Sequence, residues 1–205
     1  MTSSEAAELG TRAAQDLAAL GTEAIGPGLT DAEFDRVEQE YGFEFADDHR
    51  AFLAAGLPLN TPLPQIEGVF YSHAEPWPDW RHGDPAALRA ALRRPVEGVL
   101  FDVEHNRFWD GTWGDRPQDG AEALRVATTH LATVPGLVPV YGHRYLPAGR
   151  GGYGHSVLSM WQTDIVCYGI DLVDYIHNEF RKDGIARTDP AWKPRVTVPF
   201  WRELV

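Results

Sequence analysis

The residues best suited to chemistry lie between positions 137 and 169, in LVPVYGHRYLPAGRGGYGHSVLSMWQTDIVCYG. His143 and His155 stand there, and imidazole is a common zinc ligand. Two histidines are too few for a zinc site without thiolate or carboxylate partners, and the sequence holds no HxxxH or CxxC motif. We therefore expect no metal, and we expect His143 to hydrogen-bond its neighbours at the end of a strand.

The glycine run GRGG, residues 149–152, is a candidate phosphate-binding loop. Such loops carry a lysine at fixed spacing and lead into a helix whose N-terminus holds the anion. Here that lysine is missing and the following SVLSMW is typical of a strand, which favours a flexible connection. Cys167 lies in the apolar run DIVCY, where a buried structural thiol is expected instead of a nucleophile. We expect no cofactor in this protein.

Asp102 and Glu104 form a candidate acid–base pair if GVLFDVE, residues 98–104, is a strand. Apolar residues alternate there, which predicts a strand, and alternate strand residues share a face. A solvated strand face explains the two carboxylates without any chemistry. The chain also lacks the GxSxG motif of a serine nucleophile. The sequence therefore predicts a protein that is not an enzyme.

Four tryptophans are the candidate partner-binding residues. Trp77 and Trp80 lie in PWPDWR, and Trp109 and Trp113 lie in FWDGTWG. Both segments are predicted loops, which run over the protein surface, and exposed tryptophans often anchor interfaces. The alternative, that the rings fold back as plugs over the core, is the simpler of the two.

Local start and stop signals predict most of the helices that must position these residues. Thr30 and Glu33 form a capping box, and Gly42 is placed to end that helix in a left-handed conformation. Asp47 is expected to cap the next helix. Helices are predicted at residues 4–20, from Thr30 to Gly42, from Asp47 to Gly56, from Asp84-Pro85 to about Leu92, from the second capping box Asp119/Glu122 to about Thr133, and from Asp171 to Phe180.

Strands are predicted at residues 98–104 and 137–142, followed by a loop and by a hairpin around the turn Gln162-Thr163. The expected buried or half-buried positions of this region are Val138, Val140, Val157, Leu158, Trp161, Val166 and Tyr168. Truncating a buried Trp161 to alanine is expected to cost about 3–5 kcal/mol. The C-terminal apolar plug is expected to consist of Phe200, Trp201 and Leu204. This order of elements predicts an α+β fold with a mostly antiparallel sheet.

The composition limits the class of protein. A chain of 205 residues that is 43% hydrophobic suits one domain with a substantial core. Its net charge of −12 repels nucleic acid and anionic membranes and favours basic partners, although solubility alone also explains an acidic chain. The single cysteine and the lack of a signal peptide or an apolar window of membrane-spanning length predict a cytoplasmic protein that binds neither nucleic acid nor membrane.

The segment LTDAEFDRVEQEYGFEFADDHRAFLAAG resembles the N-terminal signature of the Smi/Knr branch of the SUKH superfamily. The segments GVLFDVEHNRFWDGTWGDRP, LVPVYGHRYLP and SVLSMWQTDIVCYGIDLVDYIHNEF are similar to a bacterial subgroup, so the resemblance covers most of residues 28–180. Ala46 stands where the family usually has a proline, and GLPLN replaces the usual Asn-Gly after the second helix. These departures affect a local turn and any partner surface that includes it.

The resemblance implies an α+β fold with a central antiparallel sheet wrapped by helices, in one domain over residues 1–205. Within it, residues 1–27 would form an N-terminal helix and connector, and residues 185–205 a C-terminal extension. The resemblance also implies a non-enzymatic immunity protein that binds and neutralises a polymorphic bacterial toxin, for example a nuclease, and we expect a monomer. The alternative is a regulatory or scaffold protein with a cellular partner. The family has no shared catalytic residue to carry over.

Overall fold

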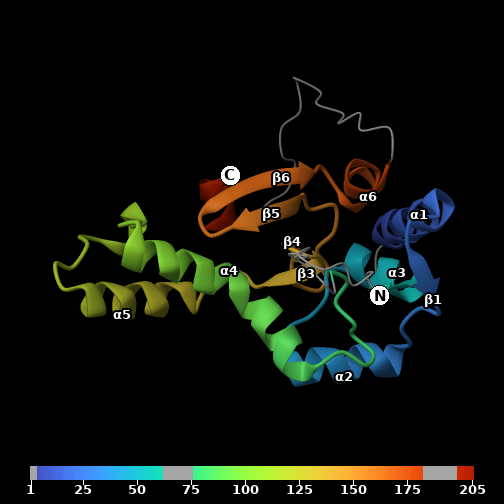
Figure 1. Ribbon diagram of the computed structural model, residues 1–205, viewed down its shortest axis with the longest axis horizontal. Helices are drawn as coiled ribbons and strands as arrows, with labels where there is room; N and C mark the ends of the chain where they lie inside the picture. Colours follow the sequence, from blue (N-terminus) through green and yellow to red (C-terminus); the bar gives the residue numbers. More distant parts are fainter. Residues whose placement is uncertain (1–3, 62–75, 182–197) are drawn as a thin grey trace, which may run out of the picture.

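A four-stranded antiparallel sheet lies between two groups of helices (Figure 1). The computed structural model describes residues 4–61, 76–181 and 198–205. The strands of this sheet follow the order β3-β4-β5-β6, at Leu137–Tyr141, Arg144–Pro147, Val157–Trp161 and Asp164–Gly169. A two-stranded antiparallel sheet pairs β1, Ala24–Gly26, with β2, Leu57–Leu59. The fold is therefore α+β, as the sequence predicts.

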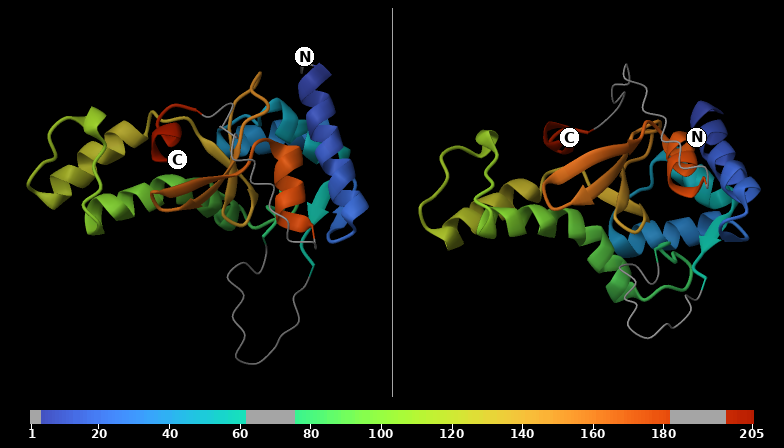
Figure 2. Two further views of the ribbon diagram at one scale, coloured as in Figure 1. Left: turned by 90° about the horizontal axis from the view of Figure 1, so that it is seen from above. Right: turned by 45° about the horizontal axis from the view of Figure 1, so that its top comes forward.

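Six α-helices are found in the described part of the chain. They are α1 (Ser4–Leu20), α2 (Asp31–Tyr41), α3 (Asp47–Ala55), α4 (Pro85–His105), α5 (Gly120–Leu131) and α6 (Leu172–Phe180). The helices α1, α3 and α6 gather at one end of the molecule, whereas α5 and the second half of α4 extend from the opposite end as a pair (Figures 1 and 2). Two short 3-10 helices, η1 (Gly111–Trp113) and η2 (Trp201–Leu204), complete the set.

The predicted caps of α2 are confirmed. Thr30 accepts a hydrogen bond from the Glu33 N–H at 3.3 Å, and Glu33 accepts one from the Thr30 N–H at 2.8 Å. Gly42 ends the helix with φ +72°, the left-handed conformation that costs glycine least. The side chains of Asp84 and Asp171 likewise cap α4 and α6.

Two other predicted caps are wrong in part. The residue at the N-cap of α3 is Ala46, and Asp47 lies in the first turn instead. Asp119 caps α5 by accepting from the Glu122 N–H at 2.8 Å, but the Glu122 carboxylate turns outward to an ion pair with Arg125. Because Arg125, three residues away, competes for the exposed Glu122 carboxylate, only the Asp119 half of the capping box forms.

The strand predicted at residues 98–104 is wrong, because this segment is the second half of α4. The helix continues through Pro95, which has no N–H to donate to the carbonyl oxygen of Ala91. The buried hydroxyl of Tyr145 donates to that oxygen instead, at 3.1 Å. A contact from β4 therefore supplies the hydrogen bond that proline removes from the helix. Pro95, Val99 and Val103 are buried, whereas Phe101, midway between the two valines, is 45% exposed. A strand would place Phe101 on the same face as the valines, so this burial pattern is helical.

The four-stranded sheet separates two cores, and alternate strand residues enter each one. One core joins α1, α2, α3 and α6 to one face of the sheet and includes Leu17, Phe34, Phe52, Val138, Leu146, Val157 and Tyr175. The other joins α4, α5 and the C-terminal residues to the opposite face and includes Val99, Ala127, Tyr145, Leu158, Met160 and Trp201. The buried Trp201 confirms part of the C-terminal plug, and its Nε1 donates to the Pro135 carbonyl at 2.7 Å.

The strand at 137–142 and the hairpin around Gln162-Thr163 are confirmed, whereas β4 is an additional strand. Val138, Val140, Val157 and Leu158 are buried and Tyr168 is half-buried, as expected. The expectation is wrong for Trp161 and Val166, which are 70% and 52% exposed. The strand β4 pairs with β5 only at Tyr145–Leu158 and Arg144–Ser159, so the tip of the hairpin extends beyond it.

Within the ranges described, no helix combines the length and apolar character needed to cross a bilayer.

Candidate protein-binding surface

The glycine-rich loop between β4 and β5 is docked on the first turn of α3. The Asp47 carboxylate accepts from the Gly151 N–H at 3.2 Å, and the Asp48 carboxylate accepts from the Gly154 N–H at 2.9 Å. The Asp47 N–H donates in return to the Gly152 carbonyl at 2.8 Å. The backbone amides that a phosphate loop would offer to an anion therefore serve two carboxylates of the protein. The sequence favours a flexible connection here, but these hydrogen bonds hold the loop against α3.

Burial perturbs two adjacent groups at this junction. It raises the pKa of Asp48 to about 6, although backbone N–H groups of Gly154 and His49 favour its charged form. Burial also lowers the pKa of His49 to about 3, so the imidazole is neutral. The His49 ring lies edge-on to Phe45 at 5.2 Å between centroids, inside the core. Burial in the folded protein is therefore the main cause of both pKa shifts.

The two histidines of the opening segment do not converge. His155 is buried next to the glycine loop, and His143 is half-buried at the turn between β3 and β4, where its Nε2 contacts the Arg144 guanidinium. This agrees with the expectation that His143 bonds a neighbour at a strand end. Within residues 4–61, 76–181 and 198–205, no group of three or more His, Cys, Asp or Glu side chains is arranged to hold a metal ion.

Arg144 and Cys167 are held by structural contacts. Arg144 donates to Glu179 of α6 at 2.9 Å and to Ser159 at 2.8 Å, and its guanidinium lies 3.9 Å from the centroid of the Tyr168 ring. These bonds join β4, β5 and α6. Cys167 is half-buried, and burial raises the pKa of its thiol despite a hydrogen bond from Ser156. A thiol with a raised pKa is a poor nucleophile at neutral pH.

Asp102 and Glu104 do not form a pair. Asp102 is buried against the hairpin, where it accepts from the Thr163 N–H at 2.9 Å, the Thr163 hydroxyl at 2.5 Å and the Asn106 amide at 2.5 Å. Burial alone would raise its pKa, but these hydrogen bonds outweigh burial and lower it. Glu104 is exposed, as expected for residues two apart on a helix. Asp102 is thus a clamp between α4 and the β5–β6 turn.

Three of the four candidate tryptophans are buried. Trp77, Trp80 and Trp113 are at most 8% exposed, and Trp109 is half-buried with its Nε1 donating to the Gly114 carbonyl at 2.7 Å. Trp77 stacks on Phe180, with 5.4 Å between ring centroids. The three buried rings act as plugs over the core, the simpler of the two expectations, and they offer a partner almost no surface.

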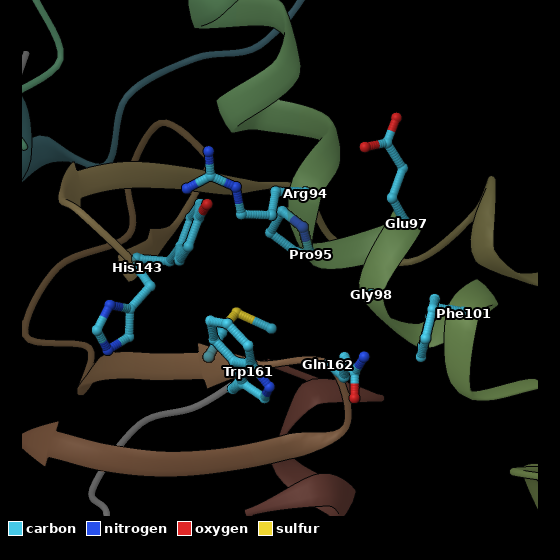
Figure 3. A pocket seen from close by; sticks show the side chains of 10 residues that line it. Arg94, Pro95, Glu97, Gly98, Phe101, His143, Trp161 and Gln162 are labelled. Atoms are coloured by element: carbon cyan, nitrogen blue, oxygen red, sulfur yellow. The ribbon is translucent and has the colours of Figure 1, made fainter. Parts of the chain in front are cut away.

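A groove between α4 and β5 holds the large exposed rings of this region instead. Its cavity of about 400 Å³ has Pro95, Tyr145 and Met160 among its lining residues. Trp161, 70% exposed, and Phe101, 45% exposed, stand at its opening. Figure 3 shows the Trp161 ring facing Arg94 and Pro95 across the cavity, with His143 to one side and Gln162 and Phe101 to the other.

The frame of this α4–β5 groove is rigidly connected. Gly98 brings α4 so close to the hairpin that a Cβ at this position would lie 2.9 Å from the Cα of Gln162. Gln162 itself has φ +58°, which suits the tight two-residue turn. The Asp102 clamp holds the next residue of the turn, and the Tyr145 hydroxyl bonds the helix on the other side of Pro95. Trp161 is therefore presented by a preorganised hairpin.

Charged groups border the groove. Glu97 lies on the exposed face of α4 in an ion pair with Arg93 at 3.0 Å, and the Arg94 guanidinium lies beside Tyr145. Burial raises the pKa of Tyr145 to about 12 although Arg94 acts in the opposite direction. Farther along, Glu104 and Asp164 are exposed. The end of the groove near the hairpin tip is thus acidic, and the end near Arg94 is basic.

Neither Trp161 nor Phe101 is among the site residues that the sequence predicts, although each has a signal. Ser159 stands two residues before Trp161, and a polar residue on that face of a strand indicates the solvent side. Phe101 stands four residues after Glu97 and four before His105, which on a helix places it in an exposed row. Comparison with models of known families, with curated proteins and with solved structures found no match.

Proposed function

We propose that the protein is a SUKH-type immunity protein, a cytoplasmic monomer that neutralises a cognate bacterial toxin by binding it and that performs no reaction itself. The observation that carries the proposal is the α4–β5 groove, where a 70% exposed indole stands on a preorganised hairpin. Exposed aromatic anchors next to a cavity are typical of protein-binding sites. The resemblance of residues 28–180 to the SUKH superfamily supplies the class of partner.

The roles of the polar groups support binding over catalysis. Asp102 clamps the hairpin, Asp47 and Asp48 hold the glycine loop, and Arg144 joins the sheet to α6. Side chains that are occupied by such hydrogen bonds stabilise the fold. The net charge of −12 favours a basic partner, as many proteins that act on nucleic acids are, because complementary charge accelerates association.

The proposal predicts that a toxin domain is encoded beside this protein's gene, and the test is co-expression of the protein with that domain. We expect the protein to restore growth to cells that express the toxin, and to bind a catalytically inactive toxin variant with 1:1 stoichiometry in isothermal titration calorimetry. A toxin from the same locus that kills at the same rate in the presence of the protein, or that shows no heat of binding, would refute the proposal.

A further inference from the structure

The cavity of the α4–β5 groove has the size and lining to receive a side chain from a partner protein. Its volume of about 400 Å³ is bounded by the apolar surfaces of Pro95, Tyr145 and Met160, all buried. Trp161 and Phe101 stand at the opening and would close over an inserted side chain. Interface energy is concentrated where an anchor fills such a pocket and its surroundings exclude water. A cavity with this lining suits an apolar or aromatic side chain.

Carboxylates follow the groove along the exposed face of α4. Glu97, Phe101 and Glu104 occupy positions i, i+4 and i+7, so they form one row on the helix. Asp164, exposed, is the cross-strand partner of Trp161 and adds a third carboxylate at the hairpin tip. This part of the rim suits cationic side chains of a partner.

Two cations near the groove do not alter this preference. Arg93 is in an exposed ion pair with Glu97, a contact that water and salt weaken and that a partner can replace. Arg94 lies at the far end, beside Tyr145. A second copy of this chain is disfavoured as the occupant, because two molecules of net charge −12 repel each other.

We infer that the α4–β5 groove is the docking site for a basic partner protein, which inserts one apolar or aromatic side chain between Trp161 and Pro95 and places cations on Glu97, Glu104 and Asp164. The inference rests on the proposed function, since the partner is the toxin proposed there. It adds where the toxin binds and what chemistry its contact surface carries.

The test measures the dissociation constant of the inactive toxin domain for the wild type and for five single variants. Trp161→Ala and Phe101→Ala remove the two rings, and Leu59→Ala is the matched control, an exposed apolar residue of β2 far from the groove. Glu97→Gln removes a rim carboxylate, and Glu122→Gln is its control, because both glutamates lie on helices in exposed ion pairs with an arginine. Melting temperatures establish that each variant is folded.

We expect Trp161→Ala to weaken binding at least tenfold and Phe101→Ala several-fold, with Leu59→Ala within twofold of the wild type. Glu97→Gln should weaken binding at low salt and reduce its salt dependence, whereas Glu122→Gln should change neither. If the wild type binds but both ring variants bind as tightly as Leu59→Ala, the docking site is wrong and the proposed function stands.

Two further results would overturn the inference. If the wild type itself does not bind, the proposed function fails and the docking site fails with it. If sedimentation at pH 7 finds a dimer that Trp161→Ala dissociates, the occupant of the groove is a second copy of the chain.

Discussion

The tryptophan side chains in the described part of the chain differ in how deeply their rings are buried, and this difference affects stability. Trp80 is 1% exposed and packs edge-on against Phe45, whereas Trp161 is 70% exposed. Truncating a buried tryptophan loses transfer free energy and leaves a cavity. We therefore expect Trp80→Ala to lower the free energy of unfolding by about 3–5 kcal/mol and Trp161→Ala by less than about 1 kcal/mol. Urea denaturation measures both, and equal losses would contradict the exposed position of Trp161.

Asp48 and His49 have opposite effects on stability as the pH falls. His49 stays neutral in the folded protein until about pH 3, whereas in the unfolded chain it is protonated near its ordinary value of 6.5. Below pH 6.5 the unfolded state therefore binds the extra proton and stability is lost. Asp48 has a folded pKa of about 6, above its ordinary 3.8, so the folded state binds the extra proton between these values and stability is gained. The two effects offset each other between about pH 6 and pH 4.

The variant His49→Leu separates these effects. It removes the group that destabilises the protein in acid and leaves Asp48 in place. We expect the stability of the variant relative to the wild type to increase by roughly 1 kcal/mol for each pH unit below 6.5. Paired urea denaturation of the two proteins at several pH values between 7 and 4 gives this difference, in which the other carboxyl groups cancel. A difference independent of pH would mean that His49 has the same pKa in the folded protein as in the unfolded chain.

At the scale of elements, the sequence correctly predicts the helix ends that are fixed by hydrogen bonds between residues close together in the chain. The box of Thr30 and Glu33 and the caps Asp84 and Asp171 are found where expected, because each involves residues two or three positions apart. The helix α4 is different. Val99 and Val103 suit a strand or a helix equally, and Pro95 indicates a break unless Tyr145, fifty-four positions away from Ala91, bonds the free carbonyl. A contact of that range has no signature in the local sequence.

The contact between α4 and the β5–β6 turn gives a prediction at the same scale. Alanine normally stabilises a helix relative to glycine. At Gly98, however, the new Cβ would lie 2.9 Å from the backbone of Gln162, so the helix or the hairpin must move. We expect Gly98→Ala to destabilise the protein by about 1–3 kcal/mol. The control is Gly120→Ala at the start of α5, where nothing lies within 4 Å of the added carbon and the change should be neutral or stabilising by up to about 1 kcal/mol.

Thermal denaturation of the two glycine variants provides the measurement. Hydrogen exchange at the Thr163 amide gives a second readout, because that N–H is bonded to Asp102. Faster exchange in Gly98→Ala alone is expected. Two variants that are equally stable would show that α4 and the hairpin are not in close contact.

At the scale of the whole molecule, the candidate surface joins segments that are distant in the chain. Asp102 and Thr163, which fix its frame, are 61 positions apart. The sequence identifies the hairpin and its turn, but it does not show that a helix approaches the hairpin tip or that β4 ends before it. For that reason Trp161 is expected in the core from the apolar character of its strand, whereas the assembled sheet exposes it. Exposure is decided by tertiary packing.

Net charge and the exposed rings of the groove together determine whether the molecule associates with copies of itself. At pH 7 the charge of −12 keeps molecules apart, and we expect a monomer of 22.8 kDa in sedimentation velocity. Near pH 5.0, the isoelectric point, this repulsion vanishes and the apolar surface around Trp161 and Phe101 is free to associate. We expect concentration-dependent association at pH 5 that Trp161→Ala reduces and that Leu59→Ala leaves unchanged. Equal association of all three proteins would show that contacts elsewhere on the surface drive it.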